Sequence, residues 1–368
     1  MIPPVFNKVQ GFKTPFEPLR ACFSLGLGGQ LRWMVISAKR TIYPAVILAA
    51  CCLAPGQTAQ PRILTIDLEN FVEYRADTSD VSLYGTNAAV TPPAAILSSR
   101  DFYVATGLGD IVAVNGQPAK GLYAMRSRAI VTDPNPSTGG AIGDVTRAAI
   151  REEAFEILSA SGNPVGTIIG LGLSGGAPPP GAPAAQTGVN FAVIGGTGAF
   201  VGVRGISGSG GGQARGASIT EDPRNRRINS GGKSRRVLTL YLMSAPEIVL
   251  TPSGPAMTHS SDFSLVTVSK PAAAGEILSA FVTGLGPVRP GVDPGQPFPS
   301  SPLAAVNSPV DVTVNGKPGE VLAAVGLPGT VNGYQVNFRL PPDTAKGTTT
   351  IQLSAAWIAA TPALIEVR

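Results

Sequence analysis

The stretch "NFAVIGGTGAFVGVRG", residues 190–205, constrains the fold of this chain more than any other. An apolar run enters a glycine-rich turn, as a strand does before a nucleotide-binding loop or before it reverses in an antiparallel sheet. A dinucleotide site needs G-x-G-x-x-G with a helix immediately after it. Gly196, Gly198 and Gly202 are spaced one residue too widely, and the β-branched residues and glycines that follow favour no helix. The stretch therefore predicts a reversing β-strand.

Alternation on both sides of the glycines supports this prediction. Side chains alternate as in a strand from Phe191 to Gly195, and again from Phe200 to Gly205. The intervening "GGTG" supplies glycines for the positive φ angles of a tight turn or bulge. We expect a return strand that begins at Phe200.

Turn residues are frequent along the whole chain. Gly (45) and Pro (34) are abundant among 368 residues, which disfavours long helices and favours many short strands. Asn115-Gly116 is a favourable hairpin turn between two alternating runs. The segment "DVTRAAIREEAFEILSASG" is ambiguous, because its Ala, Arg and Glu content favours a helix and Ile150, Ala154 and Leu158 share a helical face. The composition as a whole predicts an all-β protein.

The N-terminal region has the layout of a secretory signal. Met34 is followed by the basic pair Lys39-Arg40, a short apolar run and small residues, and the run is too short to span a bilayer. Residues 1–33 then look like an over-extended start. "LAAC" resembles a bacterial lipobox, which makes Cys51 a lipidation candidate; ordinary cleavage near Ala59 is the alternative. Either route predicts an exported protein that is extracellular, periplasmic or at the cell surface.

Charge and cysteine distributions exclude several functions for the exported body. Six of the 28 basic residues and one of the 23 acidic residues lie in residues 1–59, so the remainder holds 22 of each. A balanced body has no general attraction to nucleic acid. All three cysteines also lie in residues 1–59, which excludes a disulfide, a thiolate metal site or a cysteine nucleophile in the body. His259 is the single histidine and follows a proline-rich join, so we interpret it as a linker residue; we expect no metal and no cofactor.

Composition changes divide the chain into segments. After the leader (1–59), we expect an extension (60–100), a barrel (101–243), a linker (244–260) and a second unit (261–368). Regular short strands in the second unit predict an immunoglobulin-like β-sandwich. These strands are expected near Phe263–Val268, Glu276–Thr283, Val310–Val314, Tyr334–Leu340 and Thr348–Leu353.

Residues 101–243 resemble a known family. "GGTGAFVGVRG", "FEILSASGNPVGTIIGLG" and "GDIVAVNGQPAKGLYAMRS" are similar to segments of the allene oxide cyclase and dirigent-like β-barrels. The resemblance implies a small antiparallel barrel in which "AIREEAFEIL" is a strand and residues 176–187 and 206–216 are rim loops. Members of the family act on apolar or radical intermediates inside the barrel. The fold-signature turn consists of Gly195, Gly196, Gly198, Phe200 and Gly205.

The C-terminal unit carries a second resemblance. "GEILSAFVTGLGPVRPGV" and the segments after it, over about residues 255–368, are similar to a C-terminal domain common in secreted proteins of acidobacterial type. That domain has no established activity to carry over.

Three glutamates are candidates for catalysis. On a strand, Glu152 and Glu156 share one face and Glu153 takes the other, so one of them can enter a barrel lumen. Burial there would raise its pKa and suit it to proton transfer. The alternative is a solvated face paired with Arg147 and Arg151.

A basic segment is a candidate for anion binding. "RNRRINSGGKSRR" offers charge to anionic glycans or phospholipid headgroups, and it contains no aromatic residue to stack a nucleic-acid base. The alternative is a solvated hairpin tip. Its basic residues are Arg224, Arg226, Arg227, Lys233, Arg235 and Arg236.

Two functional hypotheses remain. The first is an exported, non-catalytic module whose barrel holds a small apolar ligand. The second is an isomerase or cyclase that uses a lumen glutamate. An open apolar cavity with a buried glutamate favours the enzyme, whereas a lumen filled by side chains favours the module.

Overall fold

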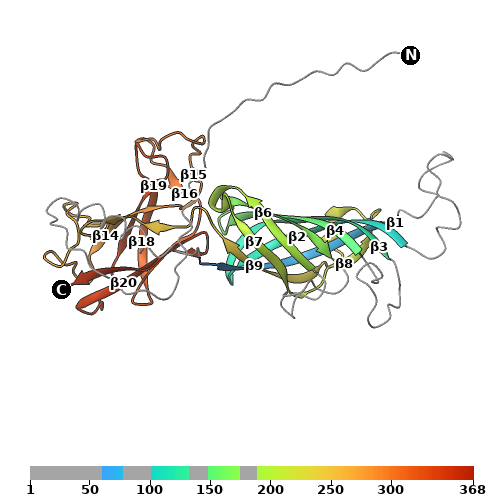
Figure 1. Ribbon diagram of the computed structural model, residues 1–368, viewed down its shortest axis with the longest axis horizontal. Coiled ribbons are helices and arrows are strands. Elements are labelled where there is room, and N and C mark those ends of the chain that lie inside the picture. Colours follow the sequence, from blue (N-terminus) through green and yellow to red (C-terminus); the bar gives the residue numbers. More distant parts are fainter. Residues whose placement is uncertain (1–59, 78–100, 132–147, 175–188) are drawn as a thin grey trace, which may run out of the picture. The chain divides into compact units, whose positions relative to one another are not determined.

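The computed structural model describes residues 60–77, 101–131, 148–174 and 189–368 (Figure 1). Over these residues the chain is all-β, as predicted, with short 3₁₀ turns. The predictions for the leader, for Cys51 and for a rim loop at residues 176–187 lie outside the described residues.

Eight antiparallel strands close into a barrel, coloured from blue to yellow in Figure 1. Neighbours along the chain pair with each other from β2 to β7, then β7 pairs with β9, β9 with β1, and β1 with β2. A ninth strand, β8 (Arg215–Ser218), runs parallel to the end of β1 beside this closed circuit. The barrel strands are β1 (Arg62–Asp77), β2 (Asp101–Val114), β3 (Gln117–Val131), β4 (Ala148–Ser159), β5 (Pro164–Ser174), β6 (Val189–Gly196), β7 (Arg204–Gly212) and β9 (Gly232–Tyr241).

The first strand lies in the segment that we assigned to an extension before the barrel. β1 pairs with β9 from Arg62 onward and with β2 from Ile66 onward, so it completes the circuit. Leu64, Ile66 and Leu68 are buried at alternate positions, as in a strand with one face on a core. The barrel therefore begins about 40 residues earlier than the sequence boundaries placed it.

The ambiguous segment is a strand. Residues of β4 pair with β3 on one side and β5 on the other over nearly their full length. Arg151, Glu153, Phe155 and Ile157 are buried at alternate positions, which is the period of a strand and not of a helix. Pairing on both edges outweighs the helical propensity of its Ala, Arg and Glu residues.

The opening stretch reverses the chain, but the return strand starts later than predicted. Phe200 lies in a 3₁₀ turn (η3, Gly198–Phe200), and Val203 N–H donates to Phe200 O at 3.1 Å, so β7 begins only at Arg204. Gly198 has φ +61°. A Cβ at Gly196 would lie 2.5 Å from Thr167 O, so only glycine fits there.

The glycine-rich segment 206–216 is also largely strand. It was expected as a rim loop, yet residues up to Gly212 belong to β7 and those from Arg215 to β8. Pairing of β7 with β9 satisfies its backbone groups despite the low strand propensity of glycine.

The C-terminal region forms a curled sheet of eleven strands. Strands were predicted near five positions; four are found, whereas residues 263–268 contribute only an isolated bridge between Thr258 and Leu265. The members are β10 (Glu247–Ile248), β13 (Met257–His259), β14 (Ile277–Thr283), β15 (Val288–Arg289), β16 (Ala305–Val306), β17 (Val310–Val314), β18 (Lys317–Gly326), β19 (Gly333–Arg339), β20 (Gly347–Ala355), β21 (Ile358–Ala359) and β22 (Ala363–Val367).

The segment expected as a linker belongs to this region. Both β10 and β13 pair with β14, and a small hairpin of β11 (Leu250–Thr251) and β12 (Gly254–Pro255) lies between them. Residues 244–260 therefore carry strands of their own. The core of the region is apolar and includes Leu278, Val336, Phe338 and Leu353, each fully buried.

Candidate functional site

One half of the barrel lumen is a closely packed apolar core. Tyr123 contacts Phe71 edge-on with ring centroids 5.3 Å apart, and Phe155 with centroids 5.0 Å apart. A Cβ at Gly107 would lie 3.0 Å from both Phe71 and Met125, so these side chains already occupy that space. The apolar side chains of this half include Leu64, Ile66, Ile111, Val114, Ile157, Val165, Ile168, Leu238 and Leu240.

The other half of the lumen is polar and charged. Along β1, β3, β4 and β9, successive inward positions change from apolar to polar, as from Phe155 to Glu153 and then Arg151 in β4. All of these side chains are buried despite their charge or polarity, which is unusual for such residues. The group consists of Glu73, Ser127, Arg151, Glu153, Ser207 and Arg236, and we call it the charged lumen.

Tyr123 joins the two halves. Its hydroxyl donates to Glu153 Oε2 at 3.0 Å and accepts from Arg236 Nη2 at 2.8 Å. Arg236 also lies over the Tyr123 ring, 5.1 Å from the centroid. Burial raises the pKa of the Tyr123 hydroxyl, Arg236 lowers it and Glu153 raises it, with a large net rise. The hydroxyl therefore stays protonated and bridges a carboxylate and a guanidinium.

A second carboxylate lies in the same half. Glu73 Oε1 accepts from Arg75 Nε at 3.0 Å and lies 3.7 Å from Arg151 Nη2. Burial lowers the pKa of Arg236, but Tyr123 and Glu153 raise it more, so this guanidinium stays charged. Two buried carboxylates thus face two buried guanidinium groups, and their formal charges cancel.

Several atoms of the charged lumen lack hydrogen-bond partners among the described residues. Glu153 Oε1 can accept, and Arg151 Nε and Arg236 Nε can donate, as can the hydroxyls of Ser127 and Ser207. A buried polar group without a partner costs about 1–3 kcal/mol. These atoms are hydrogen-bonding capacity of the charged lumen that no described residue uses.

The three candidate glutamates are separated by the barrel wall. Glu153 points inward and is 2% exposed, whereas Glu152 and Glu156 are exposed on the outside. Glu152 Oε2 accepts from Arg126 Nε at 2.5 Å, which lowers the Glu152 pKa. Arg151 pairs with Glu73 and not with the glutamates of its own strand, and Arg147 lies outside the described residues.

The basic segment does not gather into one patch. Arg236 lies in the lumen, and each of the other five cations lies within ion-pair distance of a carboxylate. Hydrogen-bonded ion pairs join Arg226 and Arg227 to Asp110, Arg224 to Asp222, Lys233 to Glu69, and Arg235 to Asp67. Burial alone would raise the pKa of Asp110, but hydrogen bonds from Arg227, Arg226 and Asn70 lower it below its usual value.

Sequence reasoning missed most of the charged lumen. Leu64, Ile66 and Leu68 place even-numbered residues of β1 inside, but a bulge before Val72 shifts the phase, so that Phe71 and Glu73 point inward instead. The alternation signal alone would have placed Glu73 outside. Ser127 and Ser207 carry no chemical signal that distinguishes them from loop serines.

Comparisons with known proteins do not decide the family. No family model matches the chain, and no curated protein matches it. Within the described residues, no three histidine, cysteine or acidic side chains lie together as metal ligands. The same residues include no helix long and apolar enough to cross a membrane.

His259 is a packed residue of β13 and not part of a linker. It is buried, and its Nδ1 lies 2.5 Å from Glu276 Oε1 and its Nε2 3.3 Å from Lys270 O. Glu276 Oε2 also accepts from Ala273 N–H at 2.7 Å. These bonds tie His259 to the segment 270–276, which is a structural role.

Proposed function

We propose that this chain is an exported, non-catalytic binding module whose barrel holds a small, largely apolar ligand with a polar group. One observation carries the proposal. In the charged lumen, buried polar atoms of Glu153, Arg151 and Arg236 have no hydrogen-bond partner among the described residues. Apolar surface adjoins these atoms: Glu153 and Phe191 both pack against Gly170. A ligand with a polar group would pair with these atoms.

Family membership forms part of the proposal. A closed eight-stranded antiparallel barrel with the 195–205 turn at one end supports the allene oxide cyclase and dirigent-like assignment. The curled C-terminal sheet, with its apolar core, supports an immunoglobulin-like domain.

The isomerase or cyclase alternative rests on Glu153. Its carboxylate points into the lumen, and Oε1 has no partner among the described residues. The close packing of Phe71, Tyr123 and Phe155 leaves the apolar half no room for a substrate or for a ligand. It therefore counts against a reaction in that half and confines a bound ligand to the charged lumen. An anionic glycan at the basic segment is less well supported, because carboxylates pair with its cations.

Native mass spectrometry of the purified chain tests the proposal. We expect a co-purifying small molecule that is released on denaturation. Glu153→Gln should reduce its occupancy several-fold, whereas Glu152→Gln, the neighbouring residue on the outer face, should leave it unchanged. A ligand retained equally by both variants, or a wild-type protein that carries and takes up no ligand, would contradict the proposal.

Export and lipidation are tested separately. Mass spectrometry of the mature N-terminus should find either a lipidated Cys51 or a start near Gln60. A mature protein that retains Met1 or Met34 would contradict export.

A further inference from the structure

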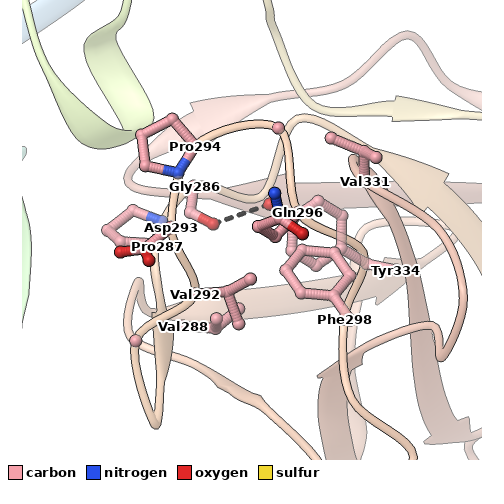
Figure 2. A pocket seen from close by; sticks show the side chains of 12 residues that line it. Gly286, Pro287, Val288, Val292, Asp293, Pro294, Gln296, Phe298, Val331 and Tyr334 are labelled. Atoms are coloured by element: carbon pink, nitrogen blue, oxygen red, sulfur yellow. Dashed lines mark hydrogen bonds between the residues drawn. The ribbon is translucent and has the colours of Figure 1, made fainter.

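A cavity of about 200 Å³ opens in the C-terminal region (Figure 2). The connection from β14 to β16 forms one side, and the turn between β18 and β19 with Tyr334 of β19 forms the other. This volume is below that of most drug-sized ligand sites, so the cavity suits a very small molecule or a single chemical group.

Two aromatic rings form a fixed wall of this cavity. Phe298 and Tyr334 are both buried, with ring centroids 5.1 Å apart and planes at 52°. The Phe298 ring lies directly on Gly326, where a Cβ would come within 2.5 Å of it. Phe298 N–H donates to Thr330 O at 2.8 Å and its carbonyl accepts from Gly329 N–H at 2.9 Å. The wall is therefore held in place without a ligand.

The only polar group of the two rings, the Tyr334 hydroxyl, already has a hydrogen-bond partner. Tyr334 OH donates to Gly286 O at 2.7 Å, the bond drawn in Figure 2. Burial raises the pKa of Tyr334 to about 12, so the phenol stays neutral near pH 7. The wall thus offers ring surface and not a phenolate.

Asp293 is the single charged residue among those that line the cavity. Figure 2 shows Asp293 and Pro294 on the side opposite Phe298 and Tyr334. Within the described residues, no cation lies within ion-pair distance of Asp293. The cavity therefore combines an unneutralised carboxylate with aromatic and valine surface.

We propose that this cavity binds a small organic cation of the quaternary ammonium type. Aromatic faces attract cations, and methylated ammonium groups have the apolar surface that Val288 and Val292 can cover. A compact, strongly hydrated cation would lose its water against these walls with little to replace it. Asp293 supplies the opposite charge.

Choline and its neutral carbon isostere, 3,3-dimethylbutan-1-ol, test the proposal on the full chain by calorimetry and ligand-observed NMR. Choline should bind at least about tenfold more tightly than the isostere, a difference of about 1.4 kcal/mol. Asp293→Asn should lower the affinity for choline severalfold and leave the affinity for the isostere unchanged. Asp343→Asn, which changes an exposed aspartate outside the cavity, should change neither affinity. Val331→Trp, at an exposed position of the rim, should block both ligands while the fold is kept.

A separate experiment distinguishes a choline group carried by a lipid from a free choline-like solute. Cosedimentation with phosphatidylcholine vesicles that Asp293→Asn abolishes would assign the cation to a lipid headgroup, and binding of free choline alone would assign it to a free solute. Equal affinity for choline and the isostere, choline binding that Asp293→Asn leaves unchanged, or no saturable binding of choline would overturn the proposal.

Discussion

The barrel and the C-terminal region use the same turn and enclose different interiors. Asn115-Gly116 and Asn315-Gly316 are both hairpin turns, with asparagine φ of 49° in each. Each asparagine exchanges two hydrogen bonds with the backbone of a threonine, at 2.7 and 2.8 Å between Asn115 and Thr65 and both at 2.8 Å between Asn315 and Thr350. Asn115 makes two longer bonds as well, from Thr65 Oγ1 at 3.2 Å and to Trp357 O at 3.4 Å. Local chemistry therefore does not distinguish the two regions.

The difference lies in what the inward faces bury. The C-terminal core is apolar, whereas the barrel buries two carboxylates and two guanidinium groups. Replacing a buried ion pair with apolar residues is often neutral or stabilising, so such groups are weak support for stability. We therefore propose that the charged lumen serves binding and not folding.

Removing one charge from the lumen should have the largest effect. Arg236→Met removes the guanidinium that is linked to Glu153 through the Tyr123 hydroxyl. Glu153 then stays buried without this compensating charge, and we expect the barrel to lose about 3–5 kcal/mol of unfolding free energy. Hydrogen exchange of peptides from β3 and β9, measured in urea, reports this loss region by region. The matched control, Arg235→Met, removes an exposed cation from the same strand and should change little; equal effects of the two variants would contradict the distinction.

Two buried tyrosine hydroxyls sharpen the comparison. Tyr123→Phe removes a bridge between Glu153 and Arg236, and we expect a loss of about 1–3 kcal/mol in the barrel. Tyr334→Phe removes one bond to a carbonyl, and we expect about 1 kcal/mol in the C-terminal region. Chemical denaturation with hydrogen exchange measures both, and a larger loss for Tyr334→Phe would reverse the expected order.

Asp110 should make part of the barrel's stability depend on pH. Its pKa is lowered in the folded state, so its contribution is present above the usual aspartate value of about 4 and is lost as the pH falls through the folded pKa. Asp110→Asn should cost about 1–2 kcal/mol at pH 7, where it removes hydrogen bonds from Arg226 and Arg227. The wild-type advantage should disappear at strongly acidic pH in parallel melting curves; a constant difference down to pH 2 would contradict this.

The smallest effects should be equal in the two regions. Asn115→Ala and Asn315→Ala each force alanine into a left-handed conformation, at a cost of about 1 kcal/mol. Because the two shorter hydrogen bonds of each asparagine match, we expect the two losses to agree within about 1 kcal/mol when each region is followed by hydrogen exchange. A clear inequality would show that the interior, and not the turn, sets the cost.

The sequence predicts local features better than it predicts the lumen. The Asn115-Gly116 turn and the all-β composition follow from residue chemistry alone. Glu153 was separated from Glu152 correctly once β4 was taken as a strand, but helical propensity obscured that choice. The inward position of Glu73 was hidden by a bulge in β1. Arg236 was grouped with Arg235 because the two are adjacent in sequence, although adjacent residues of a barrel strand point to opposite sides of the wall.

The most direct test replaces Glu153, Tyr123 and Arg236, which form the hydrogen-bonded bridge of the charged lumen, with apolar residues. It then measures the unfolding free energy of the barrel and the ligand occupancy. In the triple variant Glu153→Leu, Tyr123→Phe, Arg236→Met, we expect the barrel to unfold with at least about the wild-type free energy, because no charge of the bridge is left unpaired. Native mass spectrometry of this folded variant should find the co-purifying ligand absent. A folded triple variant that keeps the ligand at wild-type occupancy would contradict the account.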